Sequence, residues 1–206
     1  MPIYDNDGTA NYEIGKVYDF DGTTDYQTGK VYDFDGTADY LIYSAEEQLF
    51  PEQYSAWVYG TGGNAGSHEA VVNETKIYVY SDLGDTGSYA NGSKGFAYSP
   101  EIDFSQYEKM TIDFSELITG NQYGTNAKAI IGILPTETTS VTVYNNNGCS
   151  DNGEWIWKEV YVTNGVNQNG TIIYDLSEIT SKGRLWLLAY SYNTYSAITA
   201  TQIVLE

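Results

Sequence analysis

The chain has 206 residues and a formal net charge of −19, from 28 acidic and 9 basic side chains. A field of this sign repels phosphate groups, so nucleic acid and anionic membrane surfaces are excluded as expected partners. The 21 tyrosines and 21 glycines suit strands and tight turns rather than helices. Hydrophobic residues make up 41% of the chain, enough for a packed core, and the composition predicts an all-β protein.

Residues 1–43 contain three near-copies of a 14-residue unit, which begin with the segments Tyr4–Thr9, Tyr18–Thr23 and Tyr32–Thr37. In each copy an Asp-Gly step lies between short aromatic segments, a pattern typical of a β-hairpin. A lone hairpin is only marginally stable in water, so the copies must stack on the following domain or pair with other chains. We predict self-association through residues 1–43, and analogy with fibre proteins suggests a trimer.

The aspartates of the second and third copies raise the alternative of a calcium site, because hard cations require several oxygen ligands. The first copy has Asn11 in place of the last aspartate, and no copy supplies the glutamate that closes an EF-hand loop. The simpler interpretation is that Asp and Gly form the turn and Thr caps it, in which case no cofactor is needed. The candidate calcium ligands are Asp19, Asp21, Asp25, Asp33, Asp35 and Asp39.

Residues 44–53 are predicted to form a linker between the repeats and the rest of the chain. Ser44 is followed three residues later by Glu47, the pattern of a helix N-terminus, so a single helical turn is expected there. Pro51 would end this turn.

Residues 54–206 alternate short apolar segments with Asn-Gly steps and other turn signals, with almost no helical periodicity. This pattern predicts a β-sandwich of the jelly-roll type. The expected fold class is therefore all-β, with short N-terminal β-hairpin repeats followed by a jelly-roll-type sandwich. The expected strands are 76–80, 110–114, 129–134, 141–144, 155–162, 170–174, 185–190 and 198–205.

Aromatic side chains of this second domain are candidates for carbohydrate binding, because flat rings stack on the C–H faces of sugars while amides and carboxylates bind hydroxyl groups. Within residues 155–162, strand alternation places Trp155, Trp157 and Tyr161 on one face. The alternative is that such rings fill the core or an oligomer interface. The carbohydrate-binding candidates are Trp57, Tyr59, Trp155, Trp157, Tyr161 and Tyr192.

The repeated string Val-Tyr-Asp-Phe-Asp-Gly-Thr resembles the first motif of haloacid dehalogenase phosphatases, but no βαβ pattern follows it, so phosphatase activity is not expected. His68 is the only histidine, so a multi-histidine metal site cannot form, and Cys149 is the only cysteine. With 28 acidic residues a glycosidase pair of carboxylates stays open, although no motif singles out two of them. We therefore expect no catalytic residues and no enzymatic activity, with a glycan-degrading enzyme as the least favoured alternative.

The repeat Gly-Lys-Val-Tyr-Asp-x-Asp-Gly-Thr-x-x-Tyr, followed by Leu41–Ser44 and a sandwich, resembles small virion proteins of bacteriophages and prophages of gut Firmicutes. The stretch from Lys94 to Tyr107 is similar to jelly-roll carbohydrate-binding modules and tail-fibre head domains. The resemblance implies a non-enzymatic structural or adhesive virion protein, whose partners are other virion proteins and a cell-surface polysaccharide of the host. The start of the chain lacks a secretory signal, so location in the virion after synthesis in the host cytoplasm is expected.

A rival hypothesis is a monomeric carbohydrate-binding module or surface adhesin of a bacterium, in which the repeats are an appendage. The two hypotheses differ in the role of residues 1–43, because only the virion protein needs them for assembly. The oligomeric states of the full chain and of a chain that begins at Ser44 separate the two.

Overall fold

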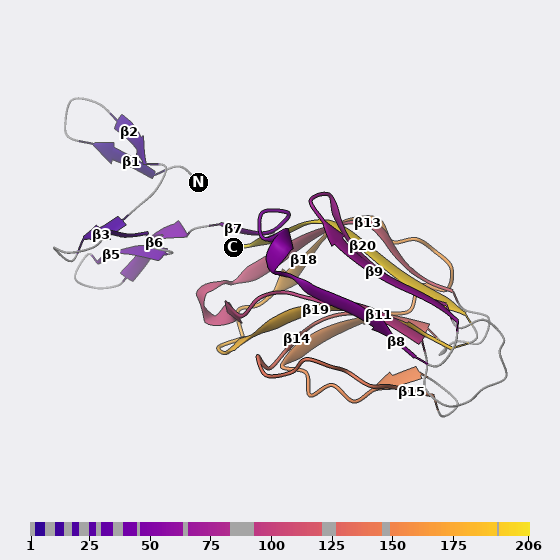
Figure 1. Ribbon diagram of the computed structural model, residues 1–206. Helices are drawn as coiled ribbons and strands as arrows, with labels where there is room; N and C mark the ends of the chain where they lie inside the picture. The colour runs from indigo at the N-terminus through magenta and orange to yellow at the C-terminus, as the bar shows by residue number, and fades with distance from the viewer. Residues whose placement is uncertain are drawn as a thin grey trace. The chain divides into compact units, whose positions relative to one another are not determined.

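The structure of the protein is a computed structural model that describes residues 3–6, 11–14, 18–20, 25–27, 30–34, 39–44, 46–63, 66–82, 93–120, 127–145, 149–192 and 194–206, with the backbone alone before residue 46 (Figure 1). These residues form strands and two short 3₁₀ helices, η1 (Tyr54–Ala56) and η2 (Phe104–Gln106). No helix in the described part of the chain is long and apolar enough to span a bilayer. The chain divides into two compact units, residues 1–47 with 206 and residues 48–205.

The N-terminal unit contains antiparallel hairpins that coincide with the three sequence repeats. β1 pairs with β2, β3 with β4, and β5 with β6, while the Asp-Gly steps themselves lie outside the described residues. The predicted hairpin repeats are therefore confirmed. The strands are β1 (Ile3–Asn6), β2 (Asn11–Ile14), β3 (Tyr18–Phe20), β4 (Asp25–Gln27), β5 (Lys30–Phe34) and β6 (Asp39–Ser44).

The second unit is a sandwich of two antiparallel sheets, ordered β18-β13-β20-β10-β9 in sheet I and β17-β14-β19-β11-β8 in sheet II. Figure 1 shows the two layers, and successive strands repeatedly change sheet, as in a jelly roll. Sheet I consists of β9 (Ser67–Asn73), β10 (Lys76–Asp82), β13 (Lys109–Thr119), β18 (Gly170–Asp175) and β20 (Tyr195–Leu205), with β7 (Glu47–Phe50) paired to β20. Sheet II consists of β8 (Val58–Gly62), β11 (Ser93–Tyr98), β14 (Ala127–Leu134), β17 (Trp157–Tyr161) and β19 (Lys182–Ser191), with β12 (Ile102–Asp103) paired to β19. A separate hairpin is formed by β15 (Val143–Asn145) and β16 (Cys149–Asp151).

The predicted fold class, hairpin repeats followed by a jelly-roll-type sandwich, is confirmed. Seven of the eight expected strands lie in the two sheets, as β10, β13, β14, β17, β18, β19 and β20, and the eighth, expected at 141–144, is β15 of the separate hairpin. The sequence does not predict β8, β9 or β11. In β8 and β11 glycines interrupt the alternation of apolar and polar residues, and β9 begins with the polar residues Ser-His-Glu.

The helical turn predicted within residues 44–53 is wrong. Glu47–Phe50 form the strand β7, which pairs with β20 of sheet I. Leu49 and Phe50 are both fully buried. Burial of two large apolar side chains contributes about 2 kcal/mol each, more than the cap of a short exposed helical turn.

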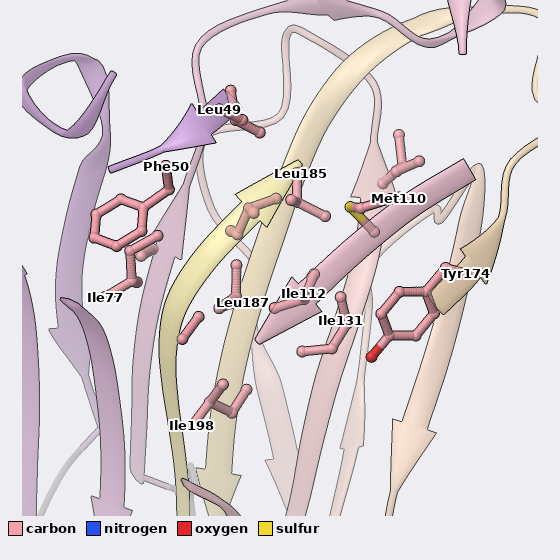
Figure 2. Close-up of a cluster of buried hydrophobic side chains, with 14 of the residues drawn as sticks. Leu49, Phe50, Ile77, Met110, Ile112, Ile131, Tyr174, Leu185, Leu187 and Ile198 are labelled. Atoms are coloured by element: carbon pink, nitrogen blue, oxygen red, sulfur yellow. The ribbon is translucent and has the colours of Figure 1, made fainter. Parts of the chain in front are cut away.

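The main core lies between the two sheets. Ile112 and Ile198 of sheet I meet Ile131 and Leu187 of sheet II, and all four side chains are fully buried. Figure 2 shows these side chains converging from opposite layers, with Tyr174 among them. Such close packing fixes the strands, so the outward side chains of each sheet also hold defined positions.

Sheet II backs directly onto sheet I where β11 lies against β9 and β10. A Cβ atom added to Gly95 would lie 2.4 Å from the carbonyl oxygen of Glu69 and 2.6 Å from that of Tyr80. Beside this contact, the buried Ser81 hydroxyl donates to the Ser93 carbonyl at 2.6 Å. This close contact between backbones therefore fixes the distance of Glu69 and Tyr80 from sheet II.

Candidate functional site

The outer surface of sheet I carries an aromatic and acidic cluster, which we call the tyrosine face. On β10 the alternation is regular, because Ile77 and Val79 are fully buried whereas Tyr78 and Tyr80 are partly exposed. The strand thus directs two rings outward while its alternate residues are held in the core. The tyrosine face consists of the outward side chains of Glu69, Lys76, Tyr78, Tyr80, Asp82, Glu116 and Tyr195.

Strand pairing brings these residues side by side. Tyr80 lies opposite Glu69 on β9 and opposite Ala197 on β20, and Tyr78 lies opposite Thr199. Ala197 and Thr199 are small and almost fully covered. The two rings therefore stand above their β20 neighbours.

The rings of Tyr78 and Tyr80 are near-parallel, with centroids 6.1 Å apart and an angle of 13° between their planes. The ammonium of Lys76 lies 5.1 Å from the centroid of the Tyr78 ring, a cation–π contact. The Tyr80 hydroxyl donates to Asp82 Oδ2 at 3.1 Å. β10 thus presents, in order, an ammonium, two rings and a carboxylate.

Burial and neighbouring carboxylates raise the pKa values of both phenols. Burial, followed by the charge and the hydrogen bond of Asp82, raises the pKa of Tyr80 from 10.0 to about 12. Burial also raises the pKa of Tyr78, with contributions from Glu116 and Glu69. Both hydroxyl groups lie in a negative potential and remain protonated donors at neutral pH.

Glu116 reaches the outer surface because β13 contains a β-bulge. The register of β13 shifts on both sides of Phe114. Ile112 and Phe114 face the core, and strict alternation would place Glu116 there too. The bulge adds one residue, so Leu117 is buried instead, and Glu116 Oε2 accepts a hydrogen bond from the Thr199 hydroxyl at 3.2 Å.

Four of the six aromatic candidates predicted from the sequence lie in the core or at an edge. Trp57 is 5% exposed, and Trp157 and Tyr161 pack against the core between the sheets. Trp157 meets Tyr174 edge-on, with 5.4 Å between the ring centroids, and the Tyr161 hydroxyl lies 2.8 Å from that of Tyr174. Tyr59 is 50% exposed on β8, an edge strand of sheet II. The structure does not gather these four rings on one surface.

The remaining candidates, Trp155 and Tyr192, belong to a second aromatic cluster on the outer side of sheet II. At its centre the rings of Tyr98 and Trp186 stack with centroids 4.5 Å apart. Tyr192 and Tyr98 are 7% and 6% exposed, and Trp186 is fully buried. This cluster is therefore a second core rather than an open platform.

Residues 135–143 help to cover this second cluster. Val141 is buried within it, the Lys94 ammonium donates to the Val141 carbonyl, and Arg184 Nε donates to the Thr136 carbonyl at 2.9 Å. The same basic side chains lie against aromatic rings, with the Arg184 guanidinium carbon 5.4 Å from the centroid of Tyr98. A ligand that approaches this side of sheet II meets the covering segment before it meets the rings.

The predicted calcium ligands Asp21 and Asp35 lie outside the described residues, as do the side chains of Asp19, Asp25, Asp33 and Asp39. Within the part of the chain that the structure describes, no group of three or more His, Cys, Asp or Glu side chains is placed to hold a metal ion. Calcium binding by the repeats stays a prediction. His68 Nδ1 lies 3.3 Å from the Ser93 hydroxyl, between the sheets.

Sequence reasoning did not single out Tyr78, Tyr80 or Glu69. A signal for the two tyrosines was present, because aliphatic and aromatic residues alternate in Lys76-Ile-Tyr-Val-Tyr80, which places both rings on one face of a strand. Glu69 and Glu116 gave no such signal, since their positions depend on strand pairing and on the bulge.

No protein-family model matches the chain, and no curated protein matches it. Among solved structures, it is similar to a carbohydrate-binding module of the β-sandwich superfamily, with 12% identity and a TM-score of 0.40 over 100% of this chain and 86% of that chain. It is also similar to the family 11 carbohydrate-binding module from Clostridium thermocellum in complex with a β-1,3-1,4-mixed-linked tetrasaccharide, with 16% identity and a TM-score of 0.37 over 78% of this chain and 94% of that chain. A third similar structure is the enzymatically active domain of tailspike protein 4 of bacteriophage CBA120, with 12% identity and a TM-score of 0.34 over 74% of this chain and only 20% of that chain. At these identities and scores, what this chain binds has to be argued from its own residues.

Proposed function

We propose that the protein is a non-enzymatic glycan-binding module that holds a polysaccharide on the tyrosine face. The observation that supports this most is the pair of near-parallel, partly exposed rings of Tyr78 and Tyr80, 6.1 Å apart on an open sheet. Rings presented in this way offer the C–H faces of sugars a large apolar surface, and they lose little conformational freedom on binding.

The polar groups around the rings suit a ligand rich in hydroxyl groups. Glu69 and Glu116 supply carboxylate acceptors, the Tyr80 oxygen can accept a hydrogen bond while its own hydrogen goes to Asp82, and the ammonium of Lys76 supplies donors. Stacking contacts of about 1 kcal/mol per ring and hydrogen bonds of about 1 kcal/mol each must outweigh the cost of association. We therefore expect dissociation constants in the range from roughly millimolar to micromolar.

Binding without turnover fits the geometry of a flat strand surface. Glycoside hydrolysis requires two carboxylates that flank a distorted sugar from opposite sides, whereas the carboxylates of Glu69 and Glu116 project from the same face of one sheet. A sugar on the tyrosine face keeps its other side in water.

For the biological setting we propose a structural or adhesive protein of a phage virion that attaches to host surface glycan. In this setting residues 1–43 associate with other copies and with other virion proteins. The alternative is a carbohydrate-binding module or adhesin of a bacterium. Both settings use the same face of the sandwich, so its ligand can be tested before the setting is known.

Affinity electrophoresis of the full chain in gels that contain single polysaccharides tests the proposal. The panel comprises β-glucan, xylan, mannan, galactan and Gram-positive cell-wall polysaccharide, each also assayed for release of reducing sugar. At least one polymer is expected to retard the protein, and none is expected to be cleaved. Retardation by no polymer would overturn the function, and cleavage would make the protein an enzyme.

Two leucine variants locate the site in the same gels. Tyr78→Leu and Tyr80→Leu keep an apolar side chain on β10 but remove the flat ring, so each is expected to weaken binding about tenfold. Tyr59→Leu is the matched control, because Tyr59 is an exposed tyrosine of sheet II. A loss with Tyr59→Leu and none with the other two would contradict the assignment to the tyrosine face.

A further inference from the structure

Resting on the glycan-binding function proposed above, we infer that the preferred glycan carries free amino groups, as polymers of glucosamine do. On the tyrosine face the carboxylates of Glu69, Asp82 and Glu116 outnumber the one ammonium, that of Lys76. Opposite charges attract more strongly near a protein surface than in bulk water. The face therefore attracts amine-bearing sugars and repels phosphorylated, sulfated or carboxylated ones.

The half of the face around Tyr80 is where a sugar amine fits. Glu69 is exposed and lies directly opposite Tyr80, and residues paired in this way have Cβ atoms about 5 Å apart. The salt bridges that the described residues form do not include Glu69. A sugar stacked on the Tyr80 ring can thus place an ammonium against the Glu69 carboxylate.

Lys76 indicates that rings on this face accept an ammonium. Its Nζ lies 5.1 Å from the centroid of Tyr78, whereas the cation–π contacts of the described residues leave the Tyr80 ring without one. An amine over Tyr80 would repeat the arrangement at Tyr78 and gain the nearby carboxylates of Glu69 and Asp82. These carboxylates already act on the rings, since Asp82 contributes to the raised pKa of Tyr80 and Glu69 to that of Tyr78.

Three hexasaccharides of the same linkage, built from glucosamine, N-acetylglucosamine or glucose, test this inference by calorimetric titration of the full chain. They differ only in an amine, an acetamide or a hydroxyl on each ring. At slightly acidic pH and low salt, the glucosamine hexamer is expected to bind about tenfold more tightly than the other two, because several exposed ion pairs add. This difference in affinity between the glucosamine hexamer and the other two should shrink several-fold as the salt concentration is raised.

Two glutamine variants separate a local contact from the attraction of the whole charge. Glu69→Gln is expected to weaken binding of the glucosamine hexamer roughly three- to fivefold and to leave the glucose hexamer unchanged. Glu178→Gln removes the same charge at an exposed position after β18, away from the tyrosine face, and should leave both unchanged. Equal losses with the two variants would overturn the inference, because the net charge of −19 would then explain the attraction.

The remaining outcomes distinguish this inference from the function on which it rests. Equal binding of the three hexamers, lost in Tyr78→Leu, would overturn the amine preference and leave glycan binding in place. Binding of neutral polysaccharides without binding of the glucosamine hexamer would also overturn the amine preference and keep glycan binding. If no hexamer and no polysaccharide binds, both the inference and the proposed function fail.

Discussion

Tyr80 owes its position to contacts on every side of it. Its chain neighbours Val79 and Ser81 are fully buried, its hydroxyl donates to Asp82, and its carbonyl lies directly over Gly95. A side chain fixed in this way has little freedom left to lose when a ligand binds. The ring of Tyr80 is therefore part of a preformed surface.

The ionisation of Tyr80 reports on this environment. Its pKa is raised from 10.0 to about 12, so it contributes stability that is fully present below pH 10.0 and is lost as the pH rises through about 12. In titrations followed by tyrosinate absorbance, Tyr80→Phe is expected to remove a component near pH 12. Asp82→Asn should move that component to lower pH, because the carboxylate that raises the pKa is gone. Loss of a component near pH 10.0 in Tyr80→Phe would contradict this account.

At the residue scale, alternation predicts only part of the site. The outward positions of Tyr78 and Tyr80 follow from the sequence Lys76-Ile-Tyr-Val-Tyr80, whose aliphatic residues must face the core. In a regular strand Glu116 would face the core, and it faces outward only because of the bulge beside Phe114. A bulge is decided by packing and pairing across the sheet, which the local sequence does not encode.

The strand β11 supports the tyrosine face from below through Gly95. Gly95→Ala would place a methyl group 2.4 Å from the Glu69 carbonyl oxygen, where only backbone could yield, so we expect a loss of about 3 kcal/mol in the free energy of unfolding. In the matched control Gly60→Ala, the methyl group meets the ring tip of Phe96 at 2.9 Å, and this ring can turn away. Urea denaturation of both variants measures the difference. Equal losses would show that the sheets separate easily beneath Tyr80.

The strand β7 is expected to be an integral part of the sandwich. Phe50→Ala removes a fully buried ring and should cost about 3–5 kcal/mol in the free energy of unfolding. Ile173→Ala, at a position 64% exposed, serves as the control and should change stability little. A small effect of Phe50→Ala in urea denaturation would mean that β7 is a loosely attached linker after all.

At the element scale, the sequence predicts where most strands lie but not which faces are open. In β14, Ile130 and Ile131 are both fully buried although they point to opposite sides of sheet II. The reason is the second aromatic cluster, which residues 135–143 help to cover. Nothing in the sequence marks Trp155 and Tyr192 as covered. Residues 135–143 lie far along the chain from β11 and β19, whose aromatic side chains they help to cover.

For the whole molecule, we predict that the repeats govern assembly. The full chain is expected to be a trimer in solution and a chain that begins at Ser44 to be a monomer, since the latter keeps β7 and the complete sandwich unit of residues 48–205. Light scattering with and without calcium measures both masses. A monomeric full chain in every condition would contradict the virion setting and favour a free-standing bacterial module. A trimer that persists in the shorter chain would place the interface in the sandwich.

The net charge of −19 has a second consequence for the whole molecule. From the sequence alone it predicts that phosphate-rich partners are repelled. Where on the surface a ligand would bind could not be inferred from charge, because acidic residues are spread along the chain. Only the pairing of β9, β10, β13 and β20 brings three of those acids beside the outward rings of Tyr78 and Tyr80.

Mapping of NMR chemical shifts in the full chain, on addition of an oligosaccharide from the polymer that binds best, tests glycan binding by the tyrosine face most directly. The largest shifts are expected on Tyr78, Tyr80, Glu69 and Tyr195, all on the outer side of sheet I. Shifts confined to Tyr98 and Trp186 on the outer side of sheet II, or to residues 1–43, would contradict binding by the tyrosine face.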